Sequence, residues 1–123
     1  MTYTGALLKT ISFAGRSFQL LYNTNNKLQS ITDGLRTTFL EQDGNGDLIR
    51  SIVTQGMIDR DTMEYTYDNH KMSRIRDPRG TVFLKNYYQN DKVYWQQDAY
   101  DKSTYFNYDT PSVGTTKVTN PTG

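Results

Sequence analysis

The chain has 123 residues, of which 35% are hydrophobic and 22% charged, and its formal net charge is +1. This near balance gives no bulk preference for nucleic acid or for an anionic membrane surface. No apolar run approaches the ~20 residues of a membrane helix, so membrane insertion is not expected, and residues 1–10 do not resemble a signal peptide. The absence of cysteine excludes disulfides and thiol chemistry.

The composition favours a folded all-β chain. A mean hydropathy of −0.77 would be compatible with disorder. However, ten Tyr, five Phe and one Trp raise the aromatic share to 13%, and disordered chains are poor in aromatic residues. Tyr, Thr, Val and Ile favour strands. We therefore expect one β domain over residues 1–123, or a fragment of a larger one that is incomplete at both ends.

In the first half, alternating apolar residues bounded by Asn, Asp and Gly predict a series of strands and turns. The strongest turn signal is 43–46, Asp-Gly-Asn-Gly. Residues 55–61 are an insertion relative to the neighbouring segments, and a longer loop is expected there. The predicted strands are 7–13, 17–22, 27–32, 36–42 and 48–54.

The second half continues the pattern. Met63, Tyr65 and Tyr67 alternate with polar residues, which is the period of two of a strand. Turns are predicted at 68–71, where His70 lies, and at 77–80, where Pro presets φ and Gly takes a positive φ. Later turns are predicted at 98–102 and 109–114. The predicted strands are 62–67, 72–76, 82–88, 93–97, 103–108 and 115–119.

Five marker residues recur at nearly constant spacing. They lie 20, 25, 21 and 20 residues apart, and an apolar residue follows each of the first four after five or six positions. A period near 20 residues corresponds to one β-hairpin per repeat, with two strands and two turns. The markers are Tyr22, Gln42, Tyr67, Tyr88 and Tyr108.

These motifs resemble the YD repeat of RHS proteins. Tyr67-Asp68 followed by Asp77-Pro78-Arg79-Gly80 is the most complete copy, and the resemblance covers residues 8–110. It implies a curved open antiparallel sheet that forms an arc of a hollow β-shell around a polypeptide cargo. It also implies secreted or cell-surface parent proteins, including toxins and adhesion proteins. The signature residues are Tyr22, Asp33, Tyr67, Asp68, Asp77, Pro78, Gly80, Tyr88, Tyr108 and Asp109.

One hairpin cannot bury its own apolar face, so hairpins must add side by side into a sheet of about ten to twelve strands. The marker tyrosines are expected to pack across strands, and each hydroxyl needs a hydrogen-bond partner. The two open edges need cover. We therefore expect self-association into a homo-oligomer or fibre, or association with the rest of a longer RHS protein.

Three motifs allow a functional and a structural interpretation. Residues 43–47 resemble the start of a calcium loop, but Leu48 and Thr54 stand where the loop needs Gly and Glu, which favours a hairpin turn. His70 is the only histidine, so it lacks partners for a zinc site. The segment 77–80 resembles both an ordinary repeat turn and the start of an autoproteolysis signature. No metal, cofactor or catalytic group is predicted.

The remaining candidate is a cluster of eight aromatic residues within 22 positions of the second half. Such rings can form a platform on which sugars stack, or they can pack between neighbouring hairpins. Because Tyr94 and Trp95 are adjacent in a strand, alternation predicts that they face opposite sides. The candidate binding residues are Tyr87, Tyr94, Trp95, Tyr100 and Tyr105.

The function predicted from the sequence is therefore a non-enzymatic structural repeat module that builds the β-sheet surface of a secreted or cell-surface RHS-type protein. The alternative is a module that binds carbohydrate or another surface through exposed Tyr and Trp side chains. An enzyme is not expected, because no nucleophile stands in a recognisable motif.

Overall fold

The computed structural model describes residues 1–55 and 59–122, which form strands and turns without a helix. The strands of the described residues are β1 (Thr2–Thr4), β2 (Leu7–Phe13), β3 (Arg16–Tyr22), β4 (Leu28–Thr32), β5 (Arg36–Gln42), β6 (Leu48–Gln55), β7 (Asp59–Asp68), β8 (Lys71–Arg76), β9 (Val82–Gln89), β10 (Lys92–Asp98), β11 (Ser103–Tyr108) and β12 (Thr116–Thr119).

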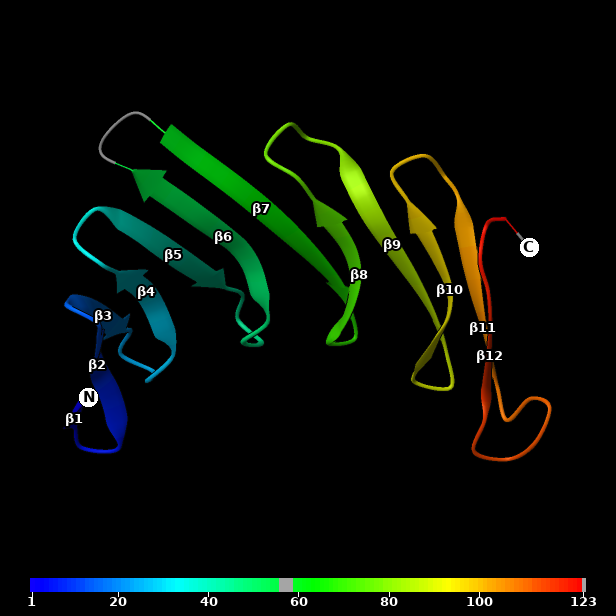
Figure 1. Ribbon diagram of the computed structural model, residues 1–123, viewed down its shortest axis with the longest axis horizontal. Coiled ribbons are helices and arrows are strands. Elements are labelled where there is room, and N and C mark those ends of the chain that lie inside the picture. Colours follow the sequence, from blue (N-terminus) through cyan, green and yellow to red (C-terminus); the bar gives the residue numbers. More distant parts are fainter. Residues whose placement is uncertain (56–58, 123) are drawn as a thin grey trace. The chain divides into compact units, whose positions relative to one another are not determined.

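Each strand pairs with the strands next to it in the sequence. The sheet order runs from β1 to β12 without a crossover, the registered pairs are antiparallel, and the sheet is not closed. This confirms the predicted all-β antiparallel hairpin sheet. The chain divides into two compact units, 1–63 and 64–123, and within each unit Figure 1 shows successive strands side by side.

The described part of the chain has no hydrophobic core. Strands contact only their neighbours in the sheet order, and Ser30, at 3% exposure, is the one fully buried residue among those described. The accessible surface is 9177 Å², whereas a compact monomer of 14.2 kDa would expose about 6,800 Å². Each unit is therefore a single layer whose two faces remain partly open.

The predicted strands are confirmed within one or two residues, and two differences stand out. Residues 2–4 form β1, which was not predicted because a strand of three residues is too short to show an alternation of apolar and polar side chains. The loop predicted at 55–61 is wrong at both ends, because Gln55 belongs to β6 and 59–61 belong to β7. The extra residues extend strands, and positions 56–58 lie outside the described residues.

Each marker residue is paired with an apolar residue of the same hairpin, which we call the anchor. The pairs are Tyr22 with Leu28, Gln42 with Leu48, Tyr67 with Met72, and Tyr88 with Val93. One residue is left unpaired directly after each anchor, which makes a β-bulge. The bulged residues are Gln29, Ile49, Ser73 and Tyr94.

The same geometry identifies an earlier copy of the repeat. Tyr3 pairs with Leu8, and Lys9 is the bulged residue that follows. Tyr3 lies 19 residues before Tyr22, so it is the first marker of the chain and Leu8 is its anchor. The predicted repeats begin only at Tyr22, because the sequence does not predict β1.

Successive hairpins are joined by a repeated side-chain hydrogen bond from a marker to the anchor of the preceding hairpin. The Tyr22 hydroxyl donates to the Leu8 carbonyl oxygen at 2.8 Å, and Gln42 Nε2 donates to the Leu28 carbonyl at 2.8 Å. Tyr88 and Tyr108 donate to the carbonyls of Met72 and Val93 at 2.7 and 2.6 Å. Glutamine can stand in a tyrosine position because its amide also reaches this carbonyl.

Four turns share one hydrogen-bond pattern. In each, the side-chain oxygen Oδ1 of the first residue accepts the backbone N–H groups two and four positions later. The fourth residue has a positive φ, which Gly, Asn and Asp tolerate best. The first residues are Asn23, Asp43, Asp77 and Asp98, and the fourth residues are Asn26, Gly46, Gly80 and Asp101.

Other turns follow different rules. Asn69-His70 and Asn90-Asp91 are two-residue turns in which both residues are left-handed, as hairpins prefer. Asp68 pairs with Lys71 across the first of them. In the last turn, Asp109 Oδ1 accepts the Gly114 N–H at 2.9 Å. The prediction that 68–71 and 109–114 are turns is therefore confirmed.

Register assigns the strand residues to two faces of each unit, since cross-strand partners share a face. One face, the anchor face, carries the markers and anchors together with pairs such as Ile75 and Leu84. The opposite face carries Tyr87, Trp95 and Tyr105 among charged and polar residues. We call this second face the stack face.

Candidate aromatic site

Three aromatic rings stack across three adjacent strands of the second unit. Tyr87 on β9 is registered with Trp95 on β10, which is registered with Tyr105 on β11. The Tyr87 and Trp95 ring centroids are 4.1 Å apart at 16°, and those of Trp95 and Tyr105 are 6.1 Å apart at 6°. Trp95 is thus the middle ring, with a tyrosine on either side. Such pairs add to the stability that area burial provides.

Two polar groups of the stack, one on Tyr87 and one on Trp95, are hydrogen-bonded. Trp95 Nε1 donates to Ser103 Oγ at 3.0 Å, and the Tyr87 hydroxyl donates to Gln97 Oε1 at 3.2 Å. Both acceptors belong to the next positions of the same face. These bonds fix the ring orientations, so the stack is a preformed feature of the sheet surface.

Simple alternation does not determine the side of the sheet on which Tyr94 lies. It is the bulged residue of β10, and a bulge interrupts the alternation of side chains. Tyr94 lines one hollow with Tyr87, Arg74 and Lys85, and a second with Tyr105. Both hollows are lined by residues of both faces, so the side of the sheet on which the Tyr94 ring lies stays a prediction.

The two hollows beside Tyr94 have volumes of about 420 and 410 Å³ and are open to solvent. Tyr94 and Tyr105 are 37% and 46% exposed, whereas Trp95 is half-buried between its neighbours. The accessible aromatic surface is therefore that of the two tyrosines. Amide side chains line the hollows as well, Asn86 in the first and Asn107 in the second.

The structure brings four of the five predicted aromatic residues together on the adjacent strands β9, β10 and β11. Tyr100 is apart from them, at the tip of the 98–102 turn, where it is largely exposed and its N–H donates to Asp98 Oδ1 at 2.8 Å. It lines neither hollow. Its position follows from the turn pattern, because it is the third residue of a turn whose first residue is Asp98.

Tyr87, Trp95 and Tyr105 form a row of registered residues across three strands, centred on the residue two places after the anchor. Other repeats have different side chains in the equivalent row. The equivalent row of the first unit is Leu21, Ser30 and Phe39, in which the buried Ser30 holds the place of Trp95. In two further repeats an arginine holds this place, registered with Glu41 in one and with Thr66 in the other. The Glu41 carboxylate and its arginine, Arg50, lie 3.0 Å apart. The sequence alone does not predict this row, because its positions can be matched between repeats only when the strand register and the bulged residues are known.

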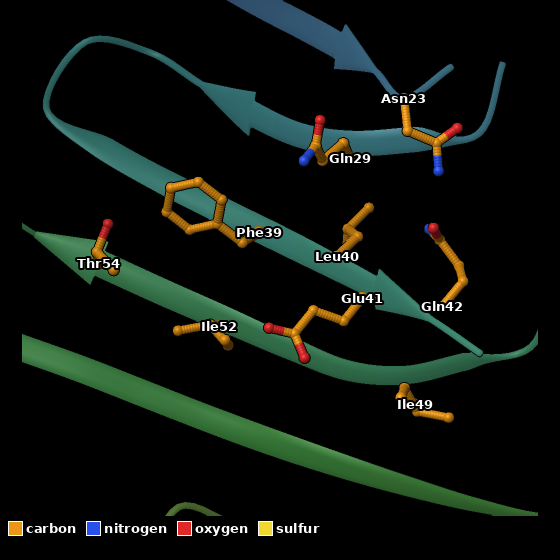
Figure 2. A pocket seen from close by; sticks show the side chains of 9 residues that line it. All are labelled: Asn23, Gln29, Phe39, Leu40, Glu41, Gln42, Ile49, Ile52 and Thr54. Atoms are coloured by element: carbon orange, nitrogen blue, oxygen red, sulfur yellow. The ribbon is translucent and has the colours of Figure 1, made fainter. Parts of the chain in front are cut away.

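A third hollow lies beside this row in the first unit, with a volume of about 600 Å³. Figure 2 shows Phe39 and Glu41 extending from β5 and Ile52 from β6. Phe39 is exposed, and the bulged residues Gln29 and Ile49 also line the hollow. The hollow is therefore an amphipathic surface groove and not an enclosed binding cavity.

Charged pairs shift the pKa of three groups at the hairpin ends, and backbone hydrogen bonds shift that of a fourth. A hydrogen bond from Lys71 to Asp91, 2.5 Å long, raises the pKa of Lys71 and lowers that of Asp91. A 2.8 Å bond to Asp101 raises the pKa of Lys85. Backbone N–H groups of residues 36 and 35 lower the pKa of Asp33. Each shift favours the charged form of a side chain at or beside a turn.

The other sequence candidates take structural places. Asp43 Oδ1 accepts two backbone N–H groups of its own turn, and His70 is a turn residue with a positive φ. Within residues 1–55 and 59–122, no group of three or more His, Asp or Glu residues is arranged to hold a metal ion. No helix in the described part of the chain is long and apolar enough to cross a membrane.

Comparison with protein-family models gives no match for this chain, and comparison with the curated proteins gives none either.

Proposed function

We propose that the chain is a non-enzymatic structural module, a run of RHS-type hairpin repeats that builds part of the β-sheet surface of a secreted or cell-surface protein. The observation that carries this proposal is the bond from a marker side chain to the preceding anchor. It recurs four times with distances of 2.6 to 2.8 Å, although the turns and row residues vary. A device that joins hairpin to hairpin serves to extend a sheet.

The missing core supports the same proposal. A single layer with no fully buried hydrophobic residue among those described gains little from apolar burial. Such a layer gains stability when something covers its faces or pairs with its edges. We therefore include edge-to-edge self-association in the proposal, with a longer RHS protein as the other source of cover.

The absence of enzymatic activity is also part of the proposal. Lys71 forms a salt bridge with Asp91 and Lys85 forms one with Asp101, so these four groups serve the ends of hairpins. The two hollows beside Tyr94 are lined by rings, amides, cations, hydroxyl groups and one carboxylate each, and the Ser73 hydroxyl in the first donates to the Thr66 carbonyl oxygen.

The test is size-exclusion chromatography with light scattering from micromolar to millimolar concentration, with circular dichroism as a check on the sheet. A mass that rises with concentration supports the proposed self-association. A folded monomer of constant mass over the whole series would overturn it.

A second candidate function, carbohydrate binding, is favoured by one observation. The exposed Tyr94 separates two hollows that both carry amide and cationic side chains, a combination that suits sugar hydroxyl groups. Trp95 itself is a poor platform, because Tyr87 covers one of its faces at 4.1 Å. The test is binding to an immobilised oligosaccharide panel. Tyr94→Ala should lose binding, whereas Tyr100→Ala, in the distant turn, should retain it.

A further inference from the structure

Two cations lie directly opposite each other on the stack face of the second unit. Arg74 on β8 is registered with Lys85 on β9, so their side chains share a face. Like charges in directly opposed positions destabilise a strand pair. A 2.8 Å hydrogen bond to Asp101 raises the pKa of Lys85, and the nearby charge of Arg74 acts in the opposite direction. The pair is therefore an unfavourable arrangement that a bound anion would relieve.

Arg74 is the less compensated of the two cations. Lys85 has its ion pair with Asp101. Among the residues that the structure describes, no carboxylate forms an ion pair with Arg74. The Arg74 side chain is exposed, and its other registered neighbour, Thr66 on β7, is neutral. The guanidinium of Arg74 is thus available to a ligand from solution.

The first hollow beside Tyr94 adjoins this pair of cations. Its volume of about 420 Å³ lies within the range of small-ligand sites, and its lining includes Arg74, Lys85 and Tyr87. One face of the Tyr87 ring stacks on Trp95 of β10, so the other face is turned toward β8. Thr66 and Ser73 add hydroxyl groups to the lining. A ring face, two cations and hydroxyl groups together suit a sugar that carries negative charge.

The hollow also contains one carboxylate, that of Asp68. Asp68 is registered with Lys71, at the turn end of β7 and β8. The pKa of Lys71 is raised mainly by its hydrogen bond to Asp91 and in smaller part by the charge of Asp68. Asp68 therefore has a cation of its own, and Arg74 stays uncompensated.

The two faces of the second unit differ in charge. Among the registered residues of this unit, the anchor face carries one charged side chain, Asp98. Lys92 is set aside, because its ammonium lies over the Tyr108 ring. The other charged side chains of these registered pairs belong to the stack face, and they are Lys71, Arg74, Arg76, Lys85 and Lys117 with the carboxylates of Glu64 and Asp68. A ligand that meets this face therefore gains from negative charge.

We propose that the hollow beside Arg74 and Lys85 binds an acidic polysaccharide, with a sugar ring against the free face of Tyr87 and the carboxylate or sulfate group of that sugar on Arg74. This inference rests on the second candidate function, carbohydrate binding, and names the hollow and the class of sugar. A guanidinium suits the role because its planar fork of donors can bind two oxygens of one anionic group. Lys85, directly opposite, adds its charge.

The test compares an oligogalacturonate with its carboxyl-reduced form, in which –CH2OH replaces each carboxylate, by isothermal titration calorimetry. The unaltered chain should bind the oligogalacturonate about tenfold more tightly. Arg74→Gln should lower that affinity about tenfold, the effect of one hydrogen bond between charged groups. Dextran sulfate, compared with dextran, tests a sulfate as the source of the charge. A preference for either acidic sugar that depends on Arg74 supports the proposal and identifies the anion.

Lys117→Gln is the matched control, because it removes one cation of the same face that lines neither hollow beside Tyr94. β12 lies four strands from β8, about 19 Å away. The charge of Lys117 is screened over that distance at physiological salt, so the affinity should stay nearly unchanged. An equal loss in both variants would mean general attraction between the protein and a polyanion, and would overturn the site. Circular dichroism checks the sheet in each variant.

The outcomes separate this inference from the functions proposed above. Equal affinity for the acidic and the neutral sugars would overturn the acidic class and leave carbohydrate binding standing. No binding to any of the four sugars would overturn both. Light scattering without sugar measures the self-association of the structural module, so neither outcome bears on that proposal.

Discussion

The Tyr108 hydroxyl lies 2.6 Å from the Val93 carbonyl oxygen and donates to it across the boundary between two hairpins. The Lys92 ammonium lies 4.9 Å from the centre of the same ring, which adds a cation–π contact. The first unit repeats this arrangement with Tyr22 and Lys9 at 5.1 Å. The marker ring is thus held at its hydroxyl and over its face, which explains why large polar-tipped side chains recur at this position.

The marker bond gives a first prediction. Tyr88→Phe removes the hydroxyl that donates to Met72 and leaves the ring in place. We expect the free energy of unfolding to fall by about 1 kcal/mol, the net value of one hydrogen bond. Urea denaturation measures the change. Tyr100→Phe is the matched control, because that side chain is largely exposed, and an equal loss in both variants would refute the assigned role.

The shared turn gives a second prediction. Asp77→Ala removes Oδ1, which accepts the N–H groups of Arg79 and Thr81, and should lower the unfolding free energy by about 1–2 kcal/mol. Asp77→Asn should cost much less, since Asn23 makes the same two bonds in its own turn. Thermal unfolding compares the two. If Asn and Ala are equally harmful, the carboxylate charge and not the turn bonds is what matters.

The Lys71–Asp91 pair gives a prediction about pH. The folded-state pKa of Asp91 is lowered, so its contribution is present above the usual value of 3.8 and is lost as pH falls through the folded-state pKa. The pKa of Lys71 is raised above 10.5, so its contribution is present below that value and is lost as pH rises through the folded-state pKa. Both side-chain groups are solvent-accessible, so the effect is small.

The measurement is the midpoint of urea unfolding between acid and alkaline pH. Asp91→Asn should flatten the dependence at both ends, because it removes the partner that shifts Lys71. Asp61→Asn, which removes a carboxylate at an exposed position outside this pair, serves as the control. An unchanged pH profile in Asp91→Asn would mean that the pair adds nothing to stability.

The sequence was sufficient for the strands, the turns and the period, because these depend on local alternation and on residues that tolerate particular φ values. Ser103–Tyr108, for example, is a strand with the predicted bounds. The side-chain arrangement on the surface was not accessible in this way. Tyr94 is an example, because a bulge that the sequence does not mark follows the anchor Val93 and interrupts the alternation of side chains.

The same limit concealed the fact that Ser30 and Trp95 hold equivalent places in their own repeats. Their places are equivalent only after each chain segment is aligned on its bulge, and no residue type is shared between them. Tyr3 was missed for a related reason, since β1 is too short to show alternation and its role is visible only from its pairing with Leu8. Register, which depends on contacts between strands, was therefore the information that the sequence lacked.

The bulge itself gives the last prediction. Ser73 is the unpaired residue between Met72 and Arg74, so its deletion should leave the pairs Tyr67–Met72 and Thr66–Arg74 in a regular ladder without a bulge. Met72 would then directly precede Arg74, which draws its carbonyl oxygen along β8 and away from the Tyr88 hydroxyl. We expect a loss of several kcal/mol, as for other changes that break packing and hydrogen bonds together.

Ser73→Ala is the control, because it removes the 3.1 Å hydroxyl bond to the Thr66 carbonyl but keeps the extra residue. It should cost about 1 kcal/mol or less, since the bond is exposed. Urea denaturation of both variants, with amide hydrogen exchange over 64–76, distinguishes the two effects. If the deletion proves as mild as the alanine variant, the bulge is dispensable. The uniform register of the repeats would then have to come from the turns alone.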